Sequence, residues 1–535
     1  MTTNERMTTN ESISSNENII ANRIPVSQDK RSSPYDVLII GAGVVGCAVA
    51  RELSRYDLKI AVLEKELDVG METSGRNSGV LHAGFNNRPG TLMAKYCVEG
   101  CLEFDQVAKE LDIPFKRTGK IVVGFTEDDK AKLCQLKEQG EQNGVPGLEI
   151  IGREKIKELA PYVDGEFALY SPVTGVLNPF IYTIALAENA RQNGVDFYFD
   201  NEVLAINHLD KAPGAKSTIH AGLANQENQP ACYQVTTKKA TYTGSWLINC
   251  AGLNADKIAR MLGIDDYTIY PCRGEYFILD KKAGDYLKIP AYPVPNPKEG
   301  GLGIHLTPTI DGNILIGPSS EYIEERDNYA ATQEIMDLLL KDGSRIFPYI
   351  RREFFIRNFA GIRPKLVSKE QGGYADFVIE EREEMPRAIN LIGIESPGLT
   401  SALPLARRVV AMVGEKENLK ERHDFNPYRQ GILCFSEQTP ERKKELIEQD
   451  PNYGEIICRC ETITKAEILQ AIHNPLGVET VVGVKNRTRA MMGRCQGGYC
   501  QTRITELIMQ EKGKEPQEVI YARQGGNMFR GRVRD

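Results

Sequence analysis

The stretch Asp36-Val37-Leu38-Ile39-Ile40-Gly41-Ala42-Gly43-Val44-Val45-Gly46 decides the fold of this chain. An apolar strand leads into a turn with three glycines, and residues 44–55 have the apolar spacing of an amphipathic helix. A second apolar strand, 59–64, ends in Glu64, which lies 18 residues after Gly46. This order is typical of the βαβ unit that opens a doubly wound sheet and binds a dinucleotide.

The glycines have different predicted roles. Gly41 permits the tight turn, Gly43 lets the backbone approach a pyrophosphate, and Gly46 allows the helix to pack closely on the strand. The helix N-terminus offers unpaired N–H groups and the positive end of a dipole to the phosphates. Glu64 can accept hydrogen bonds from ribose hydroxyls. The fingerprint by itself fits FAD and NAD equally.

Two further segments favour FAD. Residues 73–79 (Thr-Ser-Gly-Arg-Asn-Ser-Gly) form a small-residue loop whose backbone can pack against a large flat ring. Gly398-Leu399-Thr400 begins a predicted helix that runs to Gly414, and its positive end would stabilise a reduced, negatively charged flavin. We therefore predict cofactor contacts for Ser74, Asn77, Ser78, Gly398, Leu399 and Thr400.

Four cysteines form a second motif far along the chain. Cys458 and Cys460 are followed, after 34 residues, by Cys495 and Cys500. Four thiolates from two turns can hold a zinc ion or a two-iron cluster. Zinc sites usually have two to four residues between paired cysteines, so Cys-x-Cys favours iron–sulfur. Predicted helices at 464–472 and 502–510 would pack around this site.

The composition is that of a globular chain of two or three domains. Of 535 residues, 41% are hydrophobic and 26% charged, and the net charge is −7. This charge, and the lack of a basic helix interleaved with aromatic residues, disfavours nucleic-acid binding. No apolar run is long enough to span a bilayer, and no hydrophobic core of a signal peptide is recognisable. We expect a cytoplasmic protein that reaches a membrane only through a partner.

Residues 35–414 resemble the FAD-dependent D-amino-acid-oxidase superfamily. Residues 77–84, 89–92, 273–276, 292–295, 303–305 and 310–312 resemble L-2-hydroxyglutarate dehydrogenases/oxidases. Residues 360–364 (Ala-Gly-Ile-Arg-Pro) and the appended cysteines resemble the large subunit of anaerobic glycerol-3-phosphate dehydrogenases. Residues 457–461 and 492–497 resemble the bacterioferritin-associated-ferredoxin-like [2Fe–2S] domain.

These resemblances imply an α/β fold in three parts: a Rossmann-like FAD-binding domain, an antiparallel-sheet substrate subdomain inside it, and a small C-terminal α-helical iron–sulfur domain. We expect a disordered tail at 1–34, the oxidoreductase domain at 35–425 with the substrate subdomain including about 268–317, a linker at 426–455, the [2Fe–2S] domain at 456–512 and a tail at 513–535. They also imply that Ala251 and Gly252 face the ADP part of FAD.

Both candidate substrates are small anions with a secondary hydroxyl. Their oxidation needs an anion clamp, a base for the hydroxyl proton and a flavin facing the C–H bond. Arg363 is the expected clamp, with a structural salt bridge as the alternative, and Lys365 and Arg357 are weaker companions. His82 and His305 are candidate bases or hydrogen-bonded core residues, and Tyr276 is expected to orient the substrate.

A two-electron carrier joined to a one-electron carrier predicts a dehydrogenase with an electron-accepting protein subunit or a quinone as partner. We expect oxidation of sn-glycerol 3-phosphate to dihydroxyacetone phosphate. The alternatives are a 2-hydroxy acid such as L-2-hydroxyglutarate, and an electron-transfer subunit that performs no substrate chemistry.

Overall fold

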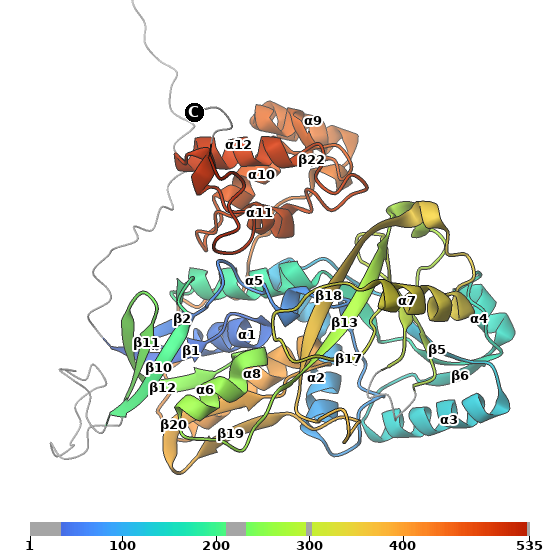
Figure 1. Ribbon diagram of the computed structural model, residues 1–535, viewed down its shortest axis with the longest axis horizontal. Coiled ribbons are helices and arrows are strands. Elements are labelled where there is room, and N and C mark those ends of the chain that lie inside the picture. The colour runs from blue at the N-terminus through green and yellow to red at the C-terminus, as the bar shows by residue number, and fades with distance from the viewer. Residues whose placement is uncertain (1–33, 210–231, 296–301, 532–535) are drawn as a thin grey trace, which may run out of the picture.

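The computed structural model describes residues 34–209, 232–295 and 302–531 of the chain. Except for Pro34, the predicted N-terminal tail lies outside these residues. Figure 1 shows a large α/β body with a smaller helical part, formed by the end of the chain, beside it. No helix within the described ranges has the length and apolarity needed to cross a bilayer.

The predicted βαβ unit lies at the centre of an eight-stranded sheet. β1 (Tyr35–Ile40) runs parallel to β2 (Ile60–Leu63) on one side and to β12 (Thr241–Asn249) on the other. The parallel part continues through β9 (Asp196–Tyr198) and β20 (Met385–Ile392). The antiparallel strands β10 (Val203–Leu209), β11 (Cys232–Thr237) and β19 (Val378–Arg382) complete it.

Side chains of β1 alternate between two cores, as expected for a strand with both faces covered. Val37 and Ile39 pack with α1 (Val44–Leu53), α5 (Pro179–Gln192) and α8 (Gly398–Gly414). Leu38 and Ile40 pack with α6 (Ala255–Met261). α2 (Leu92–Leu111) lies against α8. This double covering fixes the carboxyl end of β1, where the glycine turn begins.

A nine-stranded sheet forms the substrate subdomain. All its pairs are antiparallel except β14 with β5, which are parallel, so the predicted antiparallel sheet is confirmed with one exception. Its strands are β5 (Lys120–Gly124), β6 (Glu149–Gly152), β7 (Phe167–Ser171), β13 (Tyr270–Leu279), β14 (Ala291–Pro293), β15 (His305–Pro308), β16 (Ile314–Gly317), β17 (Glu321–Tyr322) and β18 (Phe355–Lys365).

The remaining elements of the large body surround these two sheets. The helices are α3 (Glu127–Gln142), α4 (Arg153–Leu159) and α7 (Gln333–Ile346). A small three-stranded sheet is formed by β3 (Val80–Leu81), β4 (Phe115–Arg117) and β8 (Gly175–Leu177).

The C-terminal part has a hydrophobic core of its own. It contains the hairpin of β21 (Ile456–Cys458) and β22 (Ile463–Thr464) and the helices α10 (Lys465–Ile472), α11 (Val481–Thr488) and α12 (Gln501–Lys512). α9 (Pro440–Gln449) lies in the segment predicted as a linker. Val519, in the segment predicted as a tail, packs into the core of this part.

Candidate active site

A cavity of about 960 Å³ lies between the two large sheets. The first sheet and its loops contribute Gly41, Glu64 and Ala251, and the second contributes His305 and Arg363. Of the predicted flavin-side and substrate-side residues, all line this single space except Gly46, Thr400 and the two weaker companions of Arg363, Lys365 and Arg357. The fold therefore brings together segments that are more than 300 residues apart in the sequence.

The glycine turn has the predicted geometry. Gly41 has a φ of +101°, which L side chains rarely adopt, and a Cβ on Gly46 would lie 2.0 Å from the carbonyl oxygen of Gly41. Gly43 precedes the first turn of α1, and no side chain of its own caps that helix. The Val44 N–H donates to the Ser74 Oγ over 2.9 Å. A helix N-terminus that faces a cavity and receives no cap from its own N-cap residue fits a pyrophosphate.

Glu64 is buried at the end of β2. Its two carboxylate oxygens accept N–H bonds from Ala42 (2.6 Å) and Glu66 (2.8 Å). Burial raises the pKa of this carboxyl, and the two N–H bonds oppose that rise. The carboxylate lines the cavity and is already oriented by the backbone, as a ribose-binding acid must be.

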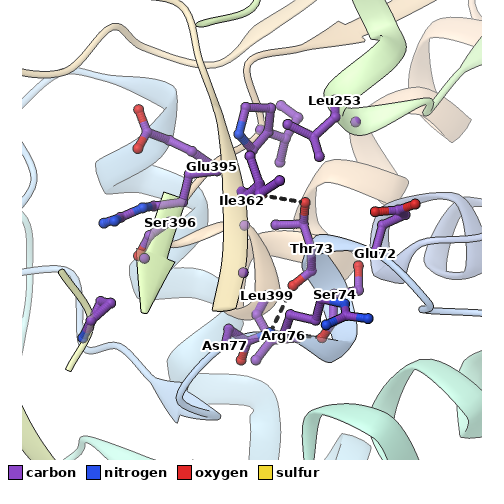
Figure 2. A pocket seen from close by; sticks show the side chains of 18 of the residues that line it. Glu72, Thr73, Ser74, Arg76, Asn77, Leu253, Ile362, Glu395, Ser396 and Leu399 are labelled. Carbon is purple, nitrogen blue, oxygen red and sulfur yellow. Dashed lines mark hydrogen bonds between the residues drawn. The ribbon is translucent and has the colours of Figure 1, made fainter. Parts of the chain in front are cut away.

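Figure 2 shows the small-residue loop beside Ile362 of β18. The Thr73 hydroxyl donates to the Ile362 carbonyl of β18 over 2.7 Å. The Asn77 amide donates to the Ser74 carbonyl over 2.7 Å. A Cβ on Gly361 would lie 2.0 Å from the Arg76 carbonyl oxygen, so loop and strand are in direct backbone contact. This loop joins the flavin side of the cavity to the strand that carries Arg363.

The start of α8 closes the same cavity. Gly398 and Leu399 line it, but Thr400 is buried behind them and accepts the N–H of His82 over 3.0 Å. Thr400 therefore holds the strand of a candidate base in place. Ala251 and Gly252 line the cavity on the other side of the glycine turn.

The predicted substrate-side residues His82, Tyr276, His305 and Arg363 all line the cavity. The guanidinium of Arg363 donates to the Ser319 carbonyl over 2.5 Å through Nη2. Tyr276 stacks on Phe359, with ring centroids 4.6 Å apart and an angle of 2°. Burial raises the pKa of Tyr276 to about 12, so its hydroxyl keeps its proton and can donate.

The two histidines differ in exposure. His305 is 4% exposed, and its Nδ1 lies 2.8 Å from the Gly303 carbonyl. Since a carbonyl only accepts, Nδ1 carries the proton and Nε2 keeps a lone pair. His82 is more open to the cavity, and burial and the nearby Lys120 charge lower its pKa to about 3. Burial also lowers the pKa of His305, so both imidazoles are neutral.

The sequence-based reasoning assigned no role to Glu395. It is buried, lines the cavity and accepts two bonds from Lys365 at 3.0 and 3.1 Å. Lys365, proposed as a companion of Arg363, is thus engaged with Glu395. Arg357 donates to Gln496 of the C-terminal part (3.1 Å). The sequence signal that could have pointed to Glu395 is a charged residue directly after the apolar strand 390–394.

The four cysteines form two pairs. The side chains of Cys458 and Cys500 lie close together, and so do those of Cys460 and Cys495. The first pair is buried and the second is exposed. Within the described ranges, no three His, Cys, Asp or Glu side chains gather around one point as a single metal ion requires. Two pairs of thiols are the donor set of a two-iron cluster, so these residues fit [2Fe–2S].

Charged contacts attach the C-terminal part to the large body. Lys281 and Glu461 are 2.6 Å apart, and Arg489 lies 2.5 Å from Asp311. Arg487 of α11 forms a buried ion pair with Asp68. α11 also lies against α5. The cysteines are thereby held at a fixed place relative to the cavity.

The comparisons with known proteins agree with this arrangement. The sequence model of the FAD dependent oxidoreductase (DAO) family matches residues 36–412, and that of the BFD-like [2Fe-2S] binding domain matches residues 456–510. The chain belongs to the FAD dependent oxidoreductase family and carries a BFD-like [2Fe–2S] domain. Its cofactors are FAD and a [2Fe–2S] cluster, and the predicted enzyme class is confirmed.

The regions of similarity to individual proteins cover different parts of the chain. A glycerol 3-phosphate dehydrogenase of Caloramator mitchellensis is 40% identical over 500 residues, which are 93% of this chain and 98% of that protein. A mitochondrial L-2-hydroxyglutarate dehydrogenase of Caenorhabditis elegans is 31% identical over 418 residues, covering 70% and 92%. The solved structure of L-alpha-glycerophosphate oxidase from Mycoplasma pneumoniae with FAD bound has a TM-score of 0.65 at 28% identity, covering 74% and 98%.

Proposed function

We propose that this protein is a dehydrogenase that oxidises sn-glycerol 3-phosphate to dihydroxyacetone phosphate and passes the electrons through [2Fe–2S] to a partner protein or a quinone. The observation that carries this proposal is the extent of similarity. The glycerol 3-phosphate dehydrogenase relative aligns with 93% of the chain, whereas the L-2-hydroxyglutarate dehydrogenase aligns with 70% and with nearly all of its own length. Only the first alignment is long enough to include both parts.

The side chains of the cavity suit a small anion with a secondary hydroxyl. The Arg363 guanidinium can donate paired hydrogen bonds to a phosphate or carboxylate. His82 is neutral and open to the cavity, so its ring can accept the hydroxyl proton. The negative substrate raises the affinity of this imidazole for the proton. Tyr276 donates a hydrogen bond that orients the substrate.

When bound, FAD would supply the two-electron acceptor for the hydride of the C–H bond. The cluster would then carry the electrons onward one at a time. The oxidation balances because the hydride leaves carbon, the hydroxyl proton moves to the histidine and the C–O bond becomes a carbonyl. The exposed pair Cys460 and Cys495 is the side of the cluster from which a partner would accept electrons.

Anaerobic stopped-flow spectroscopy of protein loaded with FAD and iron tests the proposal. We expect sn-glycerol 3-phosphate to bleach rapidly the flavin absorbance at about 450 nm. Rapid bleaching by L-2-hydroxyglutarate alone would support the second substrate, which the 31% identical relative favours. If no hydroxy acid or hydroxy phosphate bleaches the fully loaded protein, the chain is an electron-transfer subunit instead.

A further inference from the structure

Lys120 is a buried amine behind the cavity. The residue is 1% exposed, and its Nζ has no hydrogen-bond partner among the described residues. It is the first residue of β5, and its neighbours are aromatic: Nζ lies 3.6 Å from the ring centroid of Tyr292 and 4.9 Å from that of Phe85. A buried amine without an acceptor is unfavourable, so a purely structural role would be better served by leucine or methionine.

Tyr292 links this amine to the cavity. Its ring stacks on the imidazole of His305, with centroids 3.6 Å apart and an angle of 11°. The amine and the imidazole both lie 3.6 Å from the Tyr292 centroid, so they must occupy opposite faces of the ring. Tyr292 and His305 line the cavity. The three side chains form a sandwich with Lys120 on the outside and the cavity edge at His305.

We propose that Lys120 is a positioning residue for the oxidation proposed above, on which this inference rests. Its ammonium holds the Tyr292–His305 stack from behind through a cation–π contact. Its positive charge lies close enough to act on both cavity histidines and disfavours their protonation before the anionic substrate arrives.

The groups around this sandwich agree with that role. Lys120, Arg363 and His82 act on His305, and each opposes its protonation. Cys97 is near enough to act on Lys120, and Tyr276 is near enough to act on Tyr292. Burial lowers the pKa of Lys120 to about 7.

Lys120→Met tests the proposal because it keeps the length of the side chain and removes the charge. Lys116→Met is the matched control, since Lys116 is exposed on β4, the strand that precedes β5 in the sequence. The first readout is an NMR titration of 15N-labelled histidines in the FAD-loaded, substrate-free protein, which contains six histidines. His82→Gln and His305→Gln variants assign the two signals.

We expect Lys120→Met to retain FAD and to move the titrations of both cavity histidines to higher pH by about one unit or more. The acid limb of the kcat/KM profile should move in the same direction, and Lys116→Met should change neither. Unshifted histidine signals in Lys120→Met with full FAD content would overturn the proposal. A structural role alone would change stability without moving these titrations.

A second pair of variants keeps the test valid if Lys120→Met fails to fold. Tyr292→Phe keeps the ring face and the stack, whereas Tyr292→Leu removes both. We expect the pH profile of Tyr292→Phe to match the wild type and that of Tyr292→Leu to be shifted; equal profiles would contradict the proposal. The NMR titration uses no substrate, so it can be read separately from the enzyme assay. If the histidine titrations shift but no substrate bleaches the flavin, the proposed function is rejected while the effect of Lys120 on the two histidines is supported.

Discussion

Arg487 and Asp68 form a bidentate ion pair between the iron–sulfur part and the FAD-binding part. The Arg487 Nη1 and Nη2 donate to the two Asp68 carboxylate oxygens over 2.6 and 3.0 Å. Both side chains are at most 2% exposed. Asp68 lies four residues after Glu64, the predicted ribose ligand. The pair therefore attaches the cluster domain to the segment that is predicted to hold the nucleotide.

Arg487→Ala is expected to loosen this attachment. It leaves the Asp68 carboxylate buried without its partner, which costs about 3–5 kcal/mol. Substrate should still bleach the flavin at the wild-type rate, while electron transfer from flavin to cluster slows. Stopped-flow absorbance separates the two phases, and Arg442→Ala in an exposed ion pair is the control. Equal slowing of both phases would contradict a role confined to attachment.

Gly43→Ala and Gly46→Ala should fail in different ways. A Cβ on Gly46 meets the Gly41 carbonyl oxygen at 2.0 Å, so this variant should not fold stably. A Cβ on Gly43 meets only the Ser74 Oγ, at 3.1 Å, so this variant should fold but bind FAD weakly because the methyl group points to the expected pyrophosphate. Circular dichroism and the FAD content of the purified proteins distinguish these results. Full FAD content in Gly43→Ala would place the pyrophosphate elsewhere.

Arg363→Ala should remove the anion clamp. The loss of charge-assisted hydrogen bonds worth about 1.5–3 kcal/mol lowers kcat/KM about 10- to 100-fold. Most of the loss should be in KM, and the FAD content should not change. Arg351→Ala is the control, since that side chain is 55% exposed and away from the cavity. An unchanged KM for both anionic substrates would show that another group binds the anion.

Cys460→Ser should abolish the cluster and spare the flavin. A two-iron cluster takes four protein ligands, which are predicted to be thiolates here, and this variant leaves three of the thiolates. Iron content and the electron paramagnetic resonance signal of the dithionite-reduced protein should be lost, with one FAD per chain retained. Cys134→Ser on α3 is the control because that thiol belongs to neither pair. Normal iron content in Cys460→Ser would remove this residue from the ligand set.

Lys120 should make stability depend on pH in a defined direction. Burial lowers its pKa from 10.5 to about 7, so between these values the unfolded chain binds more protons than the folded protein. The free energy of unfolding therefore rises as the pH increases through that range. Below about pH 7 the folded protein bears the full cost of the buried ammonium. Relative to wild type, Lys120→Met should have its highest Tm at pH 6 and lose this advantage toward pH 10. A Tm difference independent of pH would contradict a buried ammonium.

The nucleotide half of the site was predictable because its signals are local. Gly41, Gly43 and Gly46 perform their roles within one turn, and the strand and helix on either side of them have clear apolar periodicity. The cysteine spacing is local in the same sense. Thr400 was predicted as a cofactor contact from its place at a helix start, but one step along a helix turns a side chain by about 100°. Its hydroxyl consequently binds the His82 backbone rather than lining the cavity.

The sequence by itself determined the two carriers, since each is specified by a short run of residues. Tertiary structure alone decided which side chains meet across the chain: Lys120 with Tyr292, Lys365 with Glu395 and Arg487 with Asp68. The first two pairs come from strands and loops that only the sheet registers bring together, and the third from two domains. Such contacts leave no periodic pattern, because burying a charge requires only that its partner be near in space, at any separation along the chain.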